Sequence, residues 1–268
     1  MRGLPAWSPA GRYAIPGPGA LKSFLFDGVS DYAVQTNAGV EYFGFNAAAG
    51  MGPWTISIWF KTSYSANYQW LWGIYDQSYG TWARLFLGTA ASAYSVIYQA
   101  NPAPFVWDGA LGEGGTGYLR QGAGATNPLA DGEWHHLCVT CEGVATTGKV
   151  SLYIDGALVS AGTQNATVMK ADKYQQVSGY AFNNTYLVDG NVSQMTLIKS
   201  ELSAAAVAAL YNGGKVSDPS SSSPYQYFRF GDGLTSFSDT PALVVDHGSS
   251  GVDLVGHGPP TIVTDSPQ

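Results

Sequence analysis

Four side chains that bind zinc or copper well lie close together in the segment WHHLCVTC at 134–141, namely His135, His136, Cys138 and Cys141. A tetrahedral ion needs its protein ligands to converge on one point. On a β-strand, however, successive side chains point to opposite faces. His136 and Cys138 would then share one face of the strand, and His135 and Cys141 the other. The spacing therefore predicts a strand with two free cysteines, without a four-ligand metal site and without a Cys138–Cys141 disulfide.

Two glycine motifs resemble nucleotide-binding loops but lack the helix that such loops need. Residues 112–117 fit G-x-G-x-x-G, and residues 143–149 (GVATTGK) approach a P-loop. Both kinds of site hold phosphate at the N-terminus of a helix. No helical pattern follows either motif, and Val150 stands where a P-loop has its magnesium-binding Ser or Thr. We therefore expect a loop at 112–117 and a hairpin turn at 143–149.

Catalytic carboxylates and nucleophiles are not evident. A retaining glycosidase needs two carboxylates about 5 Å apart, but no two glutamates share a strand face; they are Glu41, Glu113, Glu133, Glu142 and Glu201. An Asp–Glu pair from separate strands stays open. No G-x-S-x-G motif is present, and the histidines have no obvious nucleophile partner; they are His135, His136, His247 and His257. The sequence predicts no catalytic residue and a protein that is not an enzyme.

The segments around these residues have patterns that predict antiparallel β-structure. In KVSLYIDGALV, apolar Val150, Leu152 and Ile154 alternate with the residues between them, and Asp155-Gly156 is typical of a tight hairpin turn. WTISIWFKTS at 54–63 alternates in the same way. One helix is predicted over 203–212, because Ser203 is a good N-cap, alanines follow it, and Asn212-Gly213 is a good stop. The predicted fold class is all-β.

Several of these segments resemble the laminin-G-like domain, a jelly roll of the concanavalin A type. WHHLCVT followed by YIDG resembles its hairpin pair, SFLFDGVSDYAVQT at 23–36 its opening strand, and the residues at 187–214 its closing strand and short helix. The resemblance implies an antiparallel two-sheet sandwich. It also implies one calcium ion at the rim in some members, for which Asp27, Asp31 and Asp246 are candidates. The alternative is that these aspartates cap turns beside glycine, so a structural calcium stays open and no other cofactor is expected.

The domain organisation that we expect has four parts. Residues 1–22 form an extended N-terminal arm, and residues 23–216 form the jelly roll, with a long glycine-rich insert at 101–133. Residues 217–226 are a Ser/Pro linker. Residues 227–268 complete the same sandwich, although the similar segment in the family precedes the opening strand. The order of the motifs is therefore permuted, which is tolerated where both termini meet at one sheet edge.

Composition excludes several partners. Only 12% of the residues are charged and the net charge is −7, with no cluster of Lys and Arg, which argues against nucleic acid. No stretch has the roughly 20 apolar residues of a membrane helix. The N-terminal residues lack the apolar core of a signal peptide, so we expect synthesis in a host cytoplasm.

The permuted order resembles structural proteins of bacteriophage particles, and this resemblance implies a location in the virion. It implies a capsid decoration protein, a homo-oligomer such as a trimer, whose jelly roll faces outward and whose arm docks on the major capsid protein or other virion subunits. Trp7, Arg12 and Tyr13 are the expected contact residues of the arm.

The alternative is a tail or fibre module that binds host surface glycans, and the third hypothesis is a glycan-active enzyme. Seven aromatic residues could stack on sugars, about half of which we expect to fill the core: Tyr64, Tyr68, Trp70, Trp72, Tyr75, Tyr79 and Trp82. An exposed ladder of such rings would favour the glycan-binding alternative, and a facing carboxylate pair in a groove would favour the enzyme.

Overall fold

The computed structural model describes residues 22–35, 45–46, 50–76, 81–88, 94–101, 105–107, 118–122, 127–143, 147–165, 174–179, 185–231, 242–258 and 260–267. Trp7, Arg12 and Tyr13 of the expected arm lie outside the described residues, as does the glycine motif at 112–117.

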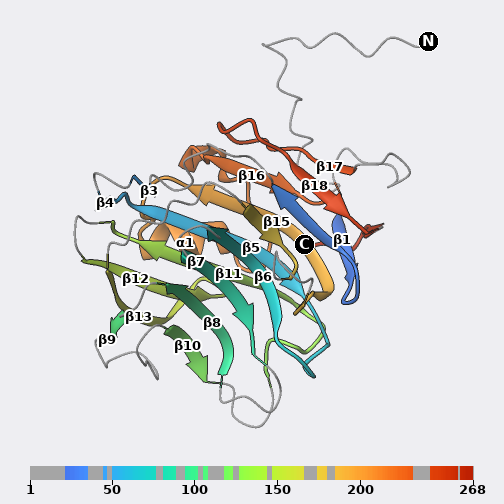
Figure 1. Ribbon diagram of the computed structural model, residues 1–268, viewed down its shortest axis with the longest axis horizontal. Helices are drawn as coiled ribbons and strands as arrows, with labels where there is room; N and C mark the ends of the chain where they lie inside the picture. The colour runs from blue at the N-terminus through green and yellow to red at the C-terminus, as the bar shows by residue number, and fades with distance from the viewer. Residues whose placement is uncertain are drawn as a thin grey trace.

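The described strands form two large antiparallel sheets that pack face to face (Figure 1). The first has nine strands, in the order β19 (Thr261–Val263), β1 (Ser23–Asp27), β15 (Asp189–Ile198), β5 (Trp54–Lys61), β11 (Trp134–Cys141), β12 (Thr147–Ile154), β13 (Ala157–Asn165) and β9 (Phe105–Trp107), with β16 (Gln226–Arg229) also paired to β15. The all-β sandwich expected from the sequence is confirmed.

The second sheet has eight strands, in the order β10 (Tyr118–Gly122), β8 (Tyr94–Asn101), β7 (Thr81–Leu87), β6 (Gln69–Asp76), β14 (Tyr174–Val177), β2 (Tyr32–Gln35), β18 (Leu254–His257) and β17 (Ala242–Val244). A separate pair consists of β3 (Phe45–Asn46) and β4 (Gly50–Met51). Strands from the C-terminal part of the chain therefore lie in both sheets, next to β1 and β15 in one and next to β2 in the other.

The space between the two large sheets is an apolar core to which strands of both sheets contribute. Its members are fully or almost fully buried and include Phe24, Ile56, Phe60, Leu71, Trp72, Leu85, Leu137, Val139, Leu152, Val192, Met195, Phe228 and Leu254. Burial of this much apolar surface is the main favourable contribution to the folded state. The core thereby holds the strands that carry the described loops in place.

Strand β11 divides its side chains between the two faces of the sheet as the alternation predicts. Leu137, Val139 and Cys141 belong to the core. Cys138 lies on the other face, in a smaller cluster with Tyr153 and Val207. The prediction that the candidate metal ligands of 134–141 separate between two faces is confirmed.

A short helix, α1 (Ala204–Tyr211), covers this second face of the nine-stranded sheet. The hydroxyl of Ser203 accepts a hydrogen bond from the amide of Ala206, and Asn212 ends the helix in the left-handed conformation. Both predicted helix ends are confirmed. The Ser/Pro segment that follows contains a 3-10 helix, η2 (Pro219–Ser222). The backbone oxygen of Ser217 accepts a hydrogen bond from the side-chain amide of Gln194 on β15.

Two predicted turns join strands of the nine-stranded sheet. Asp155 and Gly156 both have positive φ, of 49° and 76°, and connect β12 to β13. This is the backbone of a type I′ turn, for which Asp-Gly is a preferred pair. Strands β11 and β12 pair antiparallel, and Glu142 N donates to Lys149 O at 3.0 Å. Residues 147–149 of the expected turn belong to β12, and residues 144–146 lie outside the described residues. The hairpin predicted in place of a phosphate loop is therefore confirmed.

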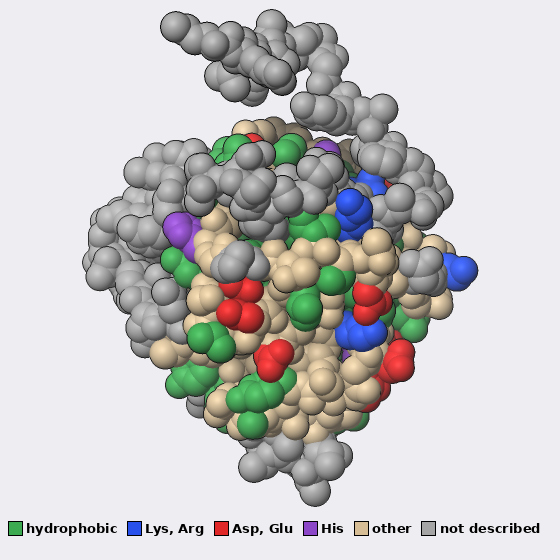
Figure 2. Space-filling model, turned by 90° about the vertical axis from the view of Figure 1, so that its right-hand side faces the viewer, with side chains coloured by type: hydrophobic (Ala, Val, Ile, Leu, Met, Phe, Trp, Pro, Cys, Tyr) green, Lys and Arg blue, Asp and Glu red, His purple; other side chains and the backbone are tan. Residues whose placement is uncertain are grey.

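Charged residues make up only 12% of the chain. On the face drawn in Figure 2, a few acidic and basic groups lie among neutral polar and backbone atoms. No helix in the described part of the chain is long and apolar enough to cross a membrane.

Candidate functional site

A group of aromatic side chains lies on the outer face of β6 and β7. Trp70 and Phe86 are opposite each other in register, and the neighbouring Leu71 and Leu85 point into the core. Tyr68, Arg84 and Tyr186 contact these two rings. We call the five residues Tyr68, Trp70, Arg84, Phe86 and Tyr186 the aromatic patch.

The aromatic patch has a buried base and two exposed rings. Trp70 and Phe86 are 8% and 6% exposed, whereas Tyr68 and Tyr186 are 38% and 46% exposed. The Tyr186 ring stacks on Trp70 with a centroid distance of 5.9 Å and an angle of 11°. The Tyr68 ring stands at 78° to Tyr186, with centroids 6.3 Å apart. The exposed rings therefore form a corner over a fixed base.

Arg84 lies against the same base. Its guanidinium carbon is 4.3 Å from the Trp70 ring centroid and 4.9 Å from that of Phe86. Attraction between the cation and the ring faces is worth about 0.5–1 kcal/mol at exposed sites. Arg84 therefore adds a positive charge to the patch and helps to fix Trp70.

The backbone at Tyr186 adopts a conformation that tyrosine rarely takes. Its φ is 60°, in the left-handed region. The backbone is held there by a hydrogen bond from Trp70 N to Tyr186 O at 2.8 Å. A non-glycine residue in this region costs about 1–2 kcal/mol, and such residues cluster at functional sites. Gly or Asn would fit this backbone better, so a tyrosine at position 186 destabilises the folded state slightly relative to these residues.

Buried polar side chains fix the two loops that carry the exposed rings. The Gln69 amide donates to Tyr64 O at 2.6 Å and accepts from Asp189 N at 2.9 Å. The Thr62 hydroxyl donates to Asp189 O at 2.6 Å. Thr62 and Gln69 are almost fully buried. Loop 62–68 and the segment before β15 are therefore tied together, and the corner between Tyr68 and Tyr186 is preorganised.

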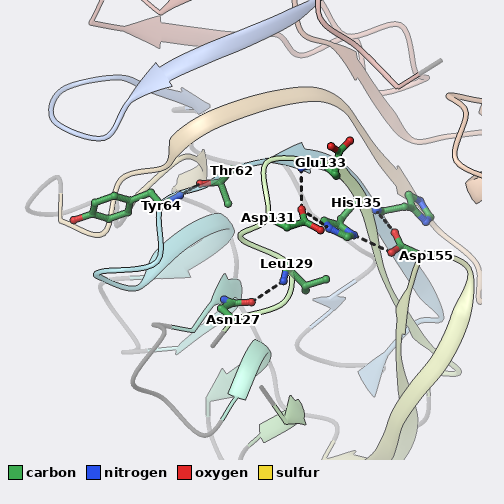
Figure 3. Close-up of polar contacts among 9 residues, drawn as sticks. Thr62, Tyr64, Asn127, Leu129, Asp131, Glu133, His135 and Asp155 are labelled. Carbon is green, nitrogen blue, oxygen red and sulfur yellow. Dashed lines mark hydrogen bonds and ion pairs between the residues drawn. The ribbon is translucent and has the colours of Figure 1, made fainter. Parts of the chain in front are cut away.

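A second polar cluster lies at the start of β11 and is drawn in Figure 3. His135 Nδ1 is 2.8 Å from Asp155, and His135 Nε2 is 3.2 Å from Asp131. Burial lowers the pKa of His135, but the hydrogen bonds and charges of Asp155 and Asp131 outweigh burial and raise it above 6.5. Burial likewise opposes the ionisation of Asp155, yet its bond to His135 leaves the Asp155 pKa lowered.

The neighbouring His136 has the opposite environment. It is fully buried, its Nε2 is 2.7 Å from the Ser57 hydroxyl, and its Nδ1 has no hydrogen-bond partner. Its ring lies beside the rings of Trp59 and Tyr211, with centroids 5.0 and 6.2 Å away. Burial lowers the pKa of His136 to about 4, although the charge of Asp155 acts in the other direction. Residues His136 and Ser57 thus form a buried neutral pair.

Both cysteines are free and buried. Burial raises the pKa of the Cys138 thiol and raises that of Cys141 to about 12, so neither presents the thiolate that metals and electrophiles require. Among the described residues, no three His, Cys, Asp or Glu side chains are placed to hold one metal ion.

The aspartates considered for calcium accept backbone hydrogen bonds. Asp27 Oδ1 accepts from the amides of Val29 and Ser30, both at 2.8 Å. Asp246 accepts from the amides of Tyr227, Gly248 and Gly251 at 2.7 to 2.9 Å. Asp31 accepts from Asp27 N at 3.1 Å. These bonds match the turn-capping alternative.

The aromatic residues named from the sequence divide between core and surface. Trp72 lies in the core, Trp70 in the base of the patch, and Tyr68 on its exposed edge. The side chains of Tyr75, Tyr79 and Trp82 lie outside the described residues. Sequence reasoning missed Arg84, Phe86 and Tyr186 as members of a site. Only the alternation in ARLFLG could have indicated the first two, and nothing local indicates the third.

The chain matches the laminin G model of the concanavalin A-like lectin/glucanases superfamily over residues 36–208. No curated protein sequence matches it significantly.

Several solved structures are similar to this chain. A candidate carbohydrate-binding protein from Bacteroides ovatus is similar with a TM-score of 0.58 and 14% identity, over 92% of this chain and 61% of that protein. A heptameric SAP-like pentraxin from Limulus polyphemus has a TM-score of 0.45 and 12% identity, over 72% of this chain and 82% of the pentraxin. Domains LG4–5 of the mouse laminin α1 chain have a TM-score of 0.43 and 14% identity, over 75% of this chain and 48% of the laminin fragment.

Proposed function

Because the chain belongs to the concanavalin A-like lectin/glucanases superfamily, we propose that it is a non-enzymatic carbohydrate-binding protein that holds a glycan on the aromatic patch. The observation that carries this proposal is the exposed ring of Tyr186, which is held on a left-handed backbone and stacked on Trp70.

The corner between Tyr68 and Tyr186 fits the chemistry of a sugar ring. A pyranose has an apolar C–H face and polar edges, and a tyrosine offers an apolar ring with a polar hydroxyl at its end. Few rotatable bonds are immobilised when a glycan binds to rings that are already fixed, which reduces the entropic cost of binding. The hydrogen bonds from the buried side chains of Thr62 and Gln69 to the backbone of Asp189 supply this preorganisation.

Binding without hydrolysis is supported by the composition of the patch. Hydrolysis of a glycosidic bond with retention or inversion needs two carboxylic groups at the scissile bond, and the patch consists of four aromatic residues and one arginine. The absence of enzymatic activity is therefore part of the proposal.

A capsid decoration protein is less well supported than a glycan-binding module. The similar structure with a TM-score of 0.58 is a candidate carbohydrate-binding protein. The expected virion location, the homo-oligomer and the docking of the arm depend on the resemblance in motif order. They stay predictions, and deletion of residues 1–22 in particles would test the arm.

The proposal is tested with a glycan array, followed by calorimetric titration of the best ligand. We expect Tyr186→Asn to weaken binding about tenfold or more, since the loss of one stacked contact of about 1.4 kcal/mol is a factor of ten. Tyr225→Asn is the matched control, because Tyr225 is a partly buried tyrosine that contacts Lys199 away from the patch. Binding of no glycan by the wild type, or equal binding by Tyr186→Asn, would refute the proposal.

A further inference from the structure

The side chain of His135 bridges two segments that are distant in the sequence. One is the loop 127–133 before β11, and the other is the hairpin turn at Asp155-Gly156. The ring reaches Asp131 of the loop at 3.2 Å and Asp155 of the turn at 2.8 Å, one from each nitrogen (Figure 3). We propose that His135 is a proton-dependent clamp, which fixes the loop when the ring is protonated and releases it when the ring is neutral. This inference does not rest on the proposed glycan binding.

The geometry requires a doubly protonated ring. Each nitrogen faces a carboxylate oxygen, and an ionised carboxylate only accepts hydrogen bonds. Both contacts are hydrogen bonds only if both nitrogens carry a proton, which is the imidazolium form. A neutral ring has one bare nitrogen, and the lone pair of that nitrogen would face a negatively charged oxygen.

The contact with Asp131 is the one that is lost on deprotonation. The contact of His135 with Asp155 is shorter than that with Asp131, at 2.8 Å against 3.2 Å. The Asp155 side chain is also less exposed, at 32% against 46% for Asp131. Asp155 also accepts a hydrogen bond from His136 N at 2.8 Å, which holds it in place. The neutral ring therefore keeps its proton on Nδ1, toward Asp155, and turns a bare Nε2 toward Asp131.

The remaining bonds of the loop determine which part moves. Asn127 donates to Gly88 O at 2.7 Å and accepts from Leu129 N at 3.0 Å, and Leu129 is part of the core. This first half of the loop stays anchored. In the second half, Glu133 N donates to Asp131 Oδ1 at 2.8 Å, and Gly132 N donates to Thr62 O at 2.9 Å. The Gly132 bond does not involve the Asp131 side chain and persists when His135 loses its proton. The Glu133 amide depends on the Asp131 carboxylate, so release of Asp131 loosens the Glu133 amide and leaves Gly132 anchored.

Few other charges act on the ring. In the described part of the chain, the charged groups that face it are Asp131 from the loop and Asp155 from the turn, while β5 contributes the uncharged ring of Phe60 at 5.9 Å. His136 lies on the opposite face of β11 and is neutral. Since the two carboxylates raise the pKa of His135, the clamp is closed in acid and opens as the pH rises through that pKa.

The test is amide hydrogen exchange, resolved by NMR, on the full chain from about pH 5 to about pH 9. Exchange is corrected for the intrinsic effect of pH, and the His135 ring is titrated in the same samples. We expect the protection of the Glu133 amide to fall several-fold as His135 loses its proton, while the Leu129 and Gly132 amides keep their protection.

Two variants complete the test. In Asp131→Asn, the protection of the Glu133 amide should no longer follow the His135 titration, and the pKa of His135 should fall. In His257→Gln, which changes an exposed histidine stacked on Tyr32, both should match the wild type. The clamp is refuted if protection of the Glu133 amide is constant through the titration, or if Asp131→Asn leaves its pH dependence unchanged.

Discussion

The burial of His136, next to His135 in the sequence, should make the free energy of unfolding decrease in acid. His136 is neutral in the folded state, with a pKa lowered from 6.5 to about 4 by burial. In the unfolded chain it takes up a proton near the ordinary value. As the pH falls below 6.5, protons bind to the unfolded state and not to the folded one, so the free energy of unfolding decreases until the pH reaches the folded pKa.

The size of the effect follows from the two pKa values. With 6.5 for the unfolded chain and about 4 for the folded protein, proton linkage removes about 2 kcal/mol of stability between about pH 7 and about pH 5. His135 acts in the opposite direction. Its raised pKa gives a contribution that is fully present below pH 6.5 and is lost as the pH rises through the folded pKa.

The assay is urea denaturation of the wild type and of His136→Gln at the two pH values. Glutamine is uncharged throughout and can still bond to Ser57, so the variant removes only the titration of His136. The contributions of His135 and of the carboxylates occur in both proteins and cancel in the comparison. We expect the wild type to lose about 2 kcal/mol more than the variant. An equal loss in both proteins would show that His136 is not a buried neutral group.

Three further predictions concern backbone contacts, each measured as a change in the free energy of unfolding. Ser203→Ala should cost about 1 kcal/mol, because it removes the N-cap bond to Ala206 N; an unchanged stability would contradict this role. Gly190→Ala should cost about 3 kcal/mol, because the φ of Gly190 is 153° and an added Cβ would lie 2.3 Å from Lys61 O. Gly213→Ala is the comparison: an added Cβ meets open space there, so only the backbone strain remains and the cost should be about 1 kcal/mol. Asp246→Asn should cost about 2 kcal/mol. The backbone N–H groups of Gly248 and Gly251 donate to different oxygens of the Asp246 carboxylate, and asparagine has only one side-chain oxygen that can accept. Equal stability would show that the carboxylate is not needed there.

The sequence predicted the features that depend on neighbouring residues. Period-two alternation placed Cys138 and Cys141 on opposite faces, Asp155-Gly156 formed the expected turn, and Ser203 capped the helix. In each case the local backbone decides the outcome, because side-chain direction, turn type and capping involve residues within four positions of one another.

The candidate sites could not be predicted in the same way. Tyr186 meets Trp70, and His135 meets Asp155, through contacts between segments that the fold brings together. A period-two pattern shows which face of a strand a residue occupies, but it does not show which strand lies alongside. The left-handed backbone at Tyr186 is set by its bond to Trp70 N and has no sequence pattern of its own.

The position of the C-terminal strands has a consequence for synthesis of the protein. Strand β2 lies between β14 and β18, and β1 lies between β15 and β19, so both are made long before their partners. During translation, the apolar side chains of Phe24 and Phe26 leave the ribosome without the strands that later cover them. The sandwich closes only after residue 263 has emerged. A nascent chain stalled before β18 therefore exposes unpaired strand edges, and such chains should depend on chaperones and be prone to aggregation.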